Sequence, residues 1–207
     1  MKKYFISGIG TDVGKTLAAA VLTESLKADY WKPVQTGSDE GTDTQRISGW
    51  ITNPNTVFFK ESYLFEHFSS PHLAADKEGE EIDAAKIKLP ETKNDVLLIE
   101  GAGGLLVPLN KKHYVIDLAK QFDAEVILVC KNYLGCINHA LLSMDYLLRH
   151  DYKIKGIIMN GYFEPLVKSA IVNYAAIPVL AEIEEMEQVS KHNISLQAQR
   201  INAKLFL

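Results

Sequence analysis

The sequence predicts an α/β fold, built on a mainly parallel sheet with helices on both faces. Short apolar runs rich in β-branched residues alternate along the chain with segments whose apolar residues recur at helical spacing. Glycine or a charged residue bounds these runs, which is typical of strands buried on both faces of a parallel sheet. A glycine-rich turn joins the first run to the first helical segment, and folds of this class bind ligands beyond the carboxyl ends of their strands.

The elements can be placed from this alternation. We expect strands over residues 4–9, 95–101, 124–130 and 154–161, and helices over residues 15–28, 115–122 and 137–150. The stretch from 36 to 93 is less regular and rich in turn-forming residues, so we expect helices and active-site loops of the same domain there rather than a linker. We therefore predict a single domain over residues 1–207, long enough to bury roughly 70% of its unfolded surface.

The composition excludes several classes of partner. A formal net charge of −4, with no dense run of Lys or Arg, gives no positive field for nucleic acid. No apolar run approaches the roughly eighteen residues that a membrane span needs, so no membrane association is expected. Cys130 and Cys136 form neither a C-x-x-C pair nor a set with zinc-like spacing, which predicts two reduced thiols in a cytoplasmic protein.

The turn after the first predicted strand has the features of a phosphate-binding loop. In ISGIGTDVGKTLAAA, residues 6–20, the Gly-Lys-Thr of residues 14–16 supplies a helix start, a lysine for phosphate oxygens and a hydroxyl for magnesium. The common pattern G-x-x-x-x-G-K-[ST] would need a glycine at position 9, where this chain has Ile9 with a glycine on either side. The flanking strand and helix favour an ATP or GTP site over an ordinary glycine turn.

A second group of polar residues follows later strands. YWKPVQTGSDEGTDTQ places Lys32 and Thr36 around a proline after a short strand, and LLIEGAGGLLVPL places Glu100 at a strand end before glycines. A carboxylate at a buried strand end costs several kcal/mol unless a cation offsets it, which makes Glu100 a candidate magnesium ligand. Asp43 precedes the helix-like TQRISGW and is our choice for a second acidic metal ligand.

Together these motifs resemble one family. GTDVGKT, KPVQTG, EGAGG followed by a proline, SPHLAA and KNYLGCINHALL occur in the order and spacing of dethiobiotin synthetase, the biotin-pathway ligase, from residue 4 to about residue 161. In that family the first glycine of the loop lies one position earlier than in the common pattern, a place that Gly8 fills. The family's loop usually reads G-T-D-T-E-V-G-K-T, and Ile9, Gly10 and Asp12 depart from it.

The resemblance implies ATP-dependent closure of a cyclic urea on 7,8-diaminopelargonic acid with carbon dioxide. An amine captures carbon dioxide as a carbamate, the carbamate oxygen attacks the γ-phosphate, and the second amine closes the ring with loss of phosphate. By this resemblance Lys15 and Lys32 are the catalytic lysines, which hold negative charge as the carbamate and the γ-phosphate approach each other. Thr36 is the hydroxyl that contacts the substrate.

The other site residues are implied by the same resemblance. Magnesium is expected with ATP as co-substrate, and its ligands would be Thr16, Asp43 and Glu100. Nucleotide contacts are expected from Asp12, Val13, Gly14, Lys15, Thr16, Leu17, Asp43, Glu100, Gly101, Ala102, Gly103, Asn160 and Gly161. Contacts to the diamine are expected from Thr11, Lys32, Thr36, Leu134, Gly135, Cys136, Ile137 and Asn138. In the family, the start of the helix expected over residues 137–150 receives the substrate carboxylate across a dimer interface, which implies a homodimer with shared sites.

Three questions stay open at the level of sequence. Asp39 and Glu40 lie in the same acidic stretch as Asp43 and are alternatives to it. The match fades beyond Asn160, which leaves the preference for ATP over other nucleotides open. A nucleotide switch or partition-type ATPase of related fold, or a scaffold without catalysis, would also carry a phosphate loop. Lys32 and the GCINHA helix start favour the ligase, because a switch needs no pocket for a small diamine.

Overall fold

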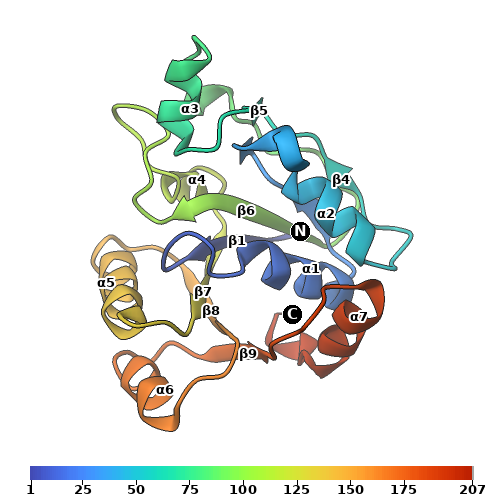
Figure 1. Ribbon diagram of the computed structural model, residues 1–207, viewed down its shortest axis with the longest axis vertical. Coiled ribbons are helices and arrows are strands. Elements are labelled where there is room, and N and C mark those ends of the chain that lie inside the picture. The colour runs from blue at the N-terminus through green and yellow to red at the C-terminus, as the bar shows by residue number, and fades with distance from the viewer. Residues whose placement is uncertain (207) are drawn as a thin grey trace.

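The computed structural model of the protein describes residues 1–206, which form a seven-stranded sheet and a separate two-stranded one (Figure 1). In spatial order the larger sheet contains β4 (Phe58–Phe59), β2 (Asp29–Trp31), β6 (Val96–Gly104), β1 (Lys2–Gly8), β7 (Glu125–Lys131), β8 (Ile154–Asn160) and β9 (Val179–Ile183). The smaller sheet pairs β3 (Val34–Gln35) with β5 (Tyr63–Leu64). Within the described residues every pairing of named strands is parallel, as predicted.

Helices connect the parallel strands. They are α1 (Lys15–Leu26), α2 (Asp43–Trp50), α3 (Pro71–Lys77), α4 (Asp117–Gln121), α5 (Cys136–Arg149), α6 (Pro165–Val172) and α7 (Lys191–Arg200), with short 3-10 turns at Ser38–Glu40, Ala84–Lys86 and Ala203–Leu205. From β1 the chain crosses to β2 on one side, and from β7 it crosses to β8 on the other. Because such crossovers are right-handed, these two directions put helices on opposite faces. Accordingly, α1 contacts α2 and α7, whereas α5 contacts α6 (Figure 1).

The core follows the central strands. In β1, β6 and β7 the stretches 4–6, 97–99 and 126–130 have no exposed surface, so side chains on both faces of each strand are covered. Ala18, Ala19 and Ala20 of α1 are equally buried, and these small side chains let α1 lie close to β6 and α7. This packing fixes the start of α1 relative to the strand ends. No helix in the described part of the chain has the length and apolar character to cross a membrane.

The observed boundaries correct the sequence-based ones at two places. The second expected strand, 95–101, continues as β6 to Gly104, so Glu100 lies inside the strand rather than at its end. It sits where the ladder with β1 is interrupted, since the register shifts between Ile6, opposite Glu100, and Gly8, opposite Gly104. The expected helix over 115–122 is only Asp117–Gln121. The α6, β9 and α7 elements were not separated by sequence reasoning.

Candidate active site

The loop after β1 shows why its first glycine stands at position 8. A Cβ added at Gly8 would lie 2.5 Å from Val13 Cγ2 and 2.8 Å from Gly10 O. The same atom added at Gly10 would meet nothing nearer than the Tyr133 hydroxyl at 3.7 Å. Gly8 is therefore the crowded position, as the resemblance implied, and Gly10 is not required for packing.

The end of the loop is fixed by contacts from β8. Gly14 has φ +89, a left-handed conformation that favours glycine, and a Cβ there would lie 2.1 Å from Asn160 Nδ2. Asn160 Nδ2 donates a hydrogen bond to Val13 O at 3.0 Å. Lys15 begins α1 with its side chain buried, and its Nζ lies 3.4 Å from Gly10 O. The structure thus brings Asn160, predicted as a nucleotide contact, beside the loop.

Four residues predicted from three separate stretches of sequence meet in one cluster, joined by a fifth. Lys32 Nζ donates to Glu100 Oε1 at 3.1 Å and forms an ion pair with Asp43. Thr16 Oγ1 donates to the same Glu100 oxygen at 2.9 Å. Tyr30, the unpredicted member, donates its hydroxyl to Glu100 Oε2 at 2.8 Å. Both oxygens of the Glu100 carboxylate are therefore held by protein donors.

The pKa values of the two lysines of the site are shifted in opposite directions. Burial by itself lowers the pKa of the Lys32 ammonium, but the carboxylates of Glu100 and Asp43 outweigh it and hold that pKa above its ordinary value. Burial also lowers the pKa of Lys15, and there the attraction of Glu100 offsets it only in part, so the net shift is downward. The pKa of Asp43 is held low because Lys32 outweighs its desolvation. Lys15 is thus the lysine whose charge an incoming anion would stabilise more.

The donor set suits magnesium. Thr16, Asp43 and Glu100 offer one hydroxyl and two carboxylates, and the Thr16 hydroxyl also helps to lower the pKa of Asp43. Magnesium prefers such hard oxygen ligands and normally keeps several waters, so few protein ligands suffice. Among the described residues there is no cluster of three or more His, Cys, Asp or Glu side chains that could hold a metal.

Local sequence explains how Asp43 reaches the cluster. Thr42 caps α2, accepting a hydrogen bond from Gln45 N at 3.1 Å, while Thr42 N donates to Gln45 Oε1 at 2.9 Å. Asp43 is therefore the first residue of the helix. The alternative Asp39 is exposed in the preceding 3-10 turn and takes no part in the cluster contacts described above.

Sequence reasoning missed Tyr30 and Gln35. Gln35 Oε1 accepts a hydrogen bond from Asp43 N at 3.0 Å, and its Nε2 donates to Thr36 O at 2.7 Å. It therefore connects the half-buried Thr36 to the start of α2. The alternation of side chains along an extended chain could have identified Tyr30, which lies in β2 two positions before Lys32, the residue that follows the strand.

The end of β6 lies against the loop. Gly103 has φ +69, and a Cβ there would lie 2.8 Å from Val107 Cγ2 and 3.7 Å from Thr11 Oγ1. Gly101 and Ala102 are buried, and Gly101 faces side chains at 3.0 Å from an added Cβ. The structure thus brings the predicted 101–103 segment beside the loop. Three further predicted residues lie in or just after the loop, with Thr11 and Asp12 exposed and Leu17 half-buried in α1.

The predicted substrate-tail residues form the start of α5. Gly135 precedes the helix at φ +102, Cys136 is buried, Ile137 is half-buried and Asn138 is exposed. Leu134 is fully exposed. A hollow of about 330 Å³ separates the loop from later turns of α5, lined by Gly10, Thr11, Gly104, Leu105, Leu106, Val107, His139, Leu142, Ser143, Tyr146 and Ile9. The residues from 134 to 138 do not line it.

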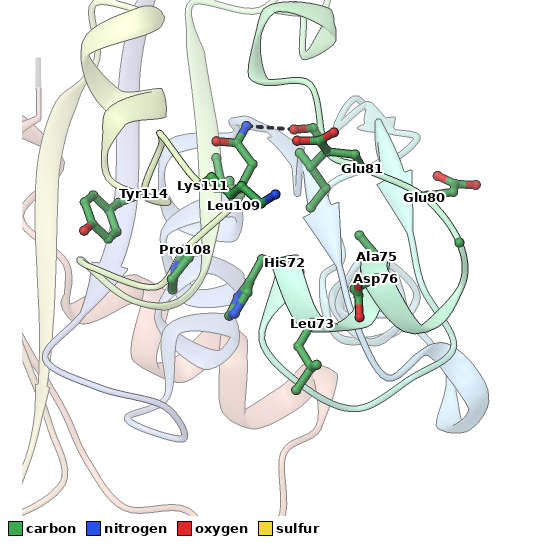
Figure 2. A pocket seen from close by; sticks show the side chains of 13 residues that line it. His72, Leu73, Ala75, Asp76, Glu80, Glu81, Pro108, Leu109, Lys111 and Tyr114 are labelled. Atoms are coloured by element: carbon green, nitrogen blue, oxygen red, sulfur yellow. Dashed lines mark hydrogen bonds between the residues drawn. The ribbon is translucent and has the colours of Figure 1, made fainter.

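The larger cleft lies elsewhere. It measures about 760 Å³ and is bounded by α3, the 79–82 segment and residues 108–114. Figure 2 shows His72, Pro108 and Lys111 around it. Asn110 and Ile82, which also line the cleft, are joined by a hydrogen bond from Asn110 Nδ2 to Ile82 O at 2.8 Å. None of the predicted site residues lines this cleft. The cleft is therefore separate from the predicted site at the loop.

Comparisons with known proteins find relatives over almost the whole chain. Residues 2–193 match the AAA domain family AAA_26. The chain is 45% identical over 201 residues to a Cytophaga hutchinsonii protein named ATP-dependent dethiobiotin synthetase BioD, covering 97% of both chains. It is 42% identical over 204 residues to a protein of the same name from Christiangramia forsetii, covering 99% of this chain and 98% of the relative.

Solved structures share the fold at low sequence identity. A putative plasmid partition protein from Borrelia burgdorferi, bound to AMPPNP, matches with a TM-score of 0.57 and 14% identity, covering 99% of this chain and 97% of that one. The septum site-determining protein MinD from Pyrococcus horikoshii, complexed with Mg-ADP, matches with a TM-score of 0.56 and 17% identity, covering 97% and 96%. These likenesses confirm the predicted P-loop α/β fold, and the sequence relatives show that the chain belongs to the dethiobiotin synthetase family.

Proposed function

We propose that this protein is an ATP- and magnesium-dependent ligase that forms the ureido ring of dethiobiotin from 7,8-diaminopelargonic acid (7,8-diaminononanoate) and carbon dioxide, with ADP and phosphate as co-products. The observation that carries the proposal is the meeting of Lys32 with Thr16, Asp43 and Glu100, beside a loop that ends in Lys15. A pure nucleotide switch needs only the loop and the metal ligands. The additional buried lysine fits a second anion at the γ-phosphate.

The chemistry follows from two anions that must meet. One substrate amine adds to carbon dioxide and loses a proton, which gives a carbamate. A carbamate oxygen then forms a bond to the γ-phosphorus, the bond to the β,γ-bridging oxygen breaks, and ADP leaves with the electron pair. The second amine attacks the carbamate carbon of this mixed anhydride, and phosphate leaves as the ring closes. Lys15 and Lys32 would reduce the repulsion between carbamate and γ-phosphate, a form of electrostatic stabilisation that enzymes commonly use.

The remaining residues supply positioning. Thr16, Asp43 and Glu100 would hold magnesium, which neutralises phosphate charge when bound. Gln35 connects Thr36, the proposed substrate hydroxyl, to Asp43 through two hydrogen bonds. This connection would keep the diamine site and the metal site at a fixed separation.

We further propose that the protein acts as a homodimer in the cytoplasm, with the α5 start of one subunit completing the site of the other. Large apolar side chains are exposed around this region, at Leu106, Leu134 and Leu142. Clusters of exposed apolar residues are typical of protein interfaces. Free N–H groups at the helix start would suit the substrate carboxylate.

Incubation with the diamine, bicarbonate, magnesium and ATP tests the proposal. We expect dethiobiotin by mass spectrometry and ADP release that depends on the diamine. ATP hydrolysis that is independent of the diamine, without dethiobiotin, would instead support a switch or partition-type ATPase. Nucleotide binding without turnover by well-folded protein would support a scaffold.

A further inference from the structure

The ammonium of Lys32 contacts the same carboxylates that are proposed to hold magnesium. Its Nζ donates to Glu100 Oε1 at 3.1 Å and forms an ion pair with Asp43 Oδ2. The hydroxyl of Thr16, the third proposed ligand, donates to the same Glu100 oxygen at 2.9 Å. The ammonium therefore lies where oxygen atoms of two proposed ligands converge, next to the third.

The hydrogen bonds of Glu100 show that the ammonium and a metal would compete. Glu100 Oε1 accepts two hydrogen bonds, as many as it has lone pairs, and Oε2 accepts one from Tyr30 at 2.8 Å. A magnesium ion on Oε1 must therefore displace Thr16 or Lys32. The Thr16 hydroxyl can turn its own oxygen to the metal, because a hydroxyl both donates and accepts. The Lys32 ammonium only donates and carries a like charge, so it is the group that leaves.

The charge of this group decides when Lys32 can serve an anionic substrate. The ammonium and the two carboxylates together carry one net negative charge, and the Lys32 side chain is only 6% exposed, which limits screening by solvent. This group would repel a carbamate. A divalent cation on the carboxylates of Asp43 and Glu100 reverses the sign and takes both partners from the ammonium. A buried charge without a partner is costly, so Lys32 then favours a new anion.

The contacts of Lys15 and Lys32 differ in this respect. Lys15 Nζ lies 3.4 Å from the backbone oxygen of Gly10, a neutral partner, so Lys15 can turn to a phosphate without breaking that contact at the cost of an ion pair. The backbone after Lys32 is held in place, because Pro33 O accepts a hydrogen bond from Ser62 N at 2.8 Å. A change of partner at Lys32 is thus confined to its flexible four-carbon side chain.

We propose that the Lys32 ammonium occupies the metal position between Asp43 and Glu100, and that it gives up this position when the divalent cation binds, which frees its charge for an anionic substrate. The inference rests on the proposed function and adds an order of events to it, because Lys32 becomes available to the carbamate only after the metal is bound. It also gives Lys32 a second role, which is to hold the two carboxylates together until the metal replaces it.

Manganese binding without nucleotide, measured by electron paramagnetic resonance, tests the exchange in three proteins. Lys32→Met keeps an unbranched side chain but has neither charge nor donor, so it should bind manganese at least tenfold more tightly than the wild type. Lys153→Met, which breaks the exposed ion pair with Asp123, should bind manganese like the wild type. Equal or weaker manganese binding by Lys32→Met, in protein that circular dichroism shows to be folded, would overturn the inference.

A measurement on the wild type keeps the inference testable if Lys32→Met does not fold. Acetic anhydride labels free amines, and mass spectrometry of the digested protein reports the labelling of each lysine separately. Labelling of Lys32 should rise severalfold when magnesium is added at constant ionic strength, because the ammonium loses both carboxylate partners, whereas labelling of Lys153 should stay constant. Labelling of Lys32 that does not change at saturating magnesium would overturn the inference.

The outcomes separate this inference from the proposed function. Dethiobiotin formation by the wild type, together with an unchanged manganese affinity in Lys32→Met, would keep the ligase and remove the exchange. Tighter manganese binding by Lys32→Met, together with a wild type that forms no dethiobiotin, would support the exchange and remove the ligase.

Discussion

Replacing Lys32 with Gln removes the cation that joins the metal site to the proposed carbamate site. The Lys32 side chain is only 6% exposed and is paired with Asp43 and Glu100 at once. Removing one preorganised electrostatic contact of this kind costs on the order of a hundred- to a thousand-fold in rate, about 3 to 4 kcal/mol of barrier. Breaking a buried ion pair from one side also destabilises a fold by about 3–5 kcal/mol, so the folded fraction must be measured alongside.

The loss of folding stability at acid pH provides an independent check on the ion pair of Lys32 with Asp43. Lys32 holds the pKa of Asp43 below its ordinary value of 3.8, so the pair contributes stability above that pH and loses it as the pH falls through the lowered pKa. In Lys32→Gln the cause of the shift is gone, and this part of the acid destabilisation should vanish. Chemical denaturation between pH 2 and 6 measures it.

Single-turnover formation of dethiobiotin and calorimetry with ATP separate rate from binding. Product formation in Lys32→Gln should fall by the stated factor, whereas ATP affinity should change much less because Lys15 and the loop remain. The surface pair of Lys153 and Asp123, at 2.6 Å, offers the control Lys153→Gln, which should leave both unchanged. Near-normal product formation by folded Lys32→Gln would refute the catalytic assignment.

Three further variants test other contacts of the site. Tyr30→Phe should raise the magnesium concentration needed for half-maximal turnover and weaken manganese binding measured by electron paramagnetic resonance. The control Tyr4→Phe, at another buried tyrosine, should do neither, and equal effects of the two variants would mean that Tyr30 has a purely structural role. Gly8→Ala should reduce ATP affinity at least tenfold through the clash in the loop, while Gly10→Ala should bind normally, and equal affinities would contradict the loop geometry. Because burial lowers the pKa of Lys15, kcat/KM for ATP should decline with rising pH, at a pH below the ordinary pKa of lysine. Lys15→Arg should remove this decline, and an unchanged pH profile would exclude Lys15 as its source.

The fold was largely predictable because its strands are buried on both faces and its helices are amphipathic or small-residue segments. The central strands were placed within a few residues, since their apolar runs end at glycine or charge. The prediction failed at β6, where Glu100 and the following glycines signal a strand end although pairing continues to Gly104. The cause is tertiary, because Thr16, Tyr30 and Lys32 from other segments satisfy the buried carboxylate.

The site was predictable where one motif carries the chemistry and not where contacts join distant segments. Lys15 and Lys32 could be named from sequence, and side-chain alternation could have added Tyr30, but Gln35 acts through partners that no local pattern reveals.

The most direct test of the central claim follows an oxygen atom from bicarbonate to phosphate. If a carbamate oxygen attacks the γ-phosphorus, a rapid single turnover with ¹⁸O-labelled bicarbonate, the diamine, magnesium and ATP should give dethiobiotin and one ¹⁸O atom in the released phosphate. Mass spectrometry of the phosphate reads the label, and an unlabelled-bicarbonate reaction sets the background. Phosphate without the label, released while dethiobiotin forms from labelled bicarbonate, would contradict the account.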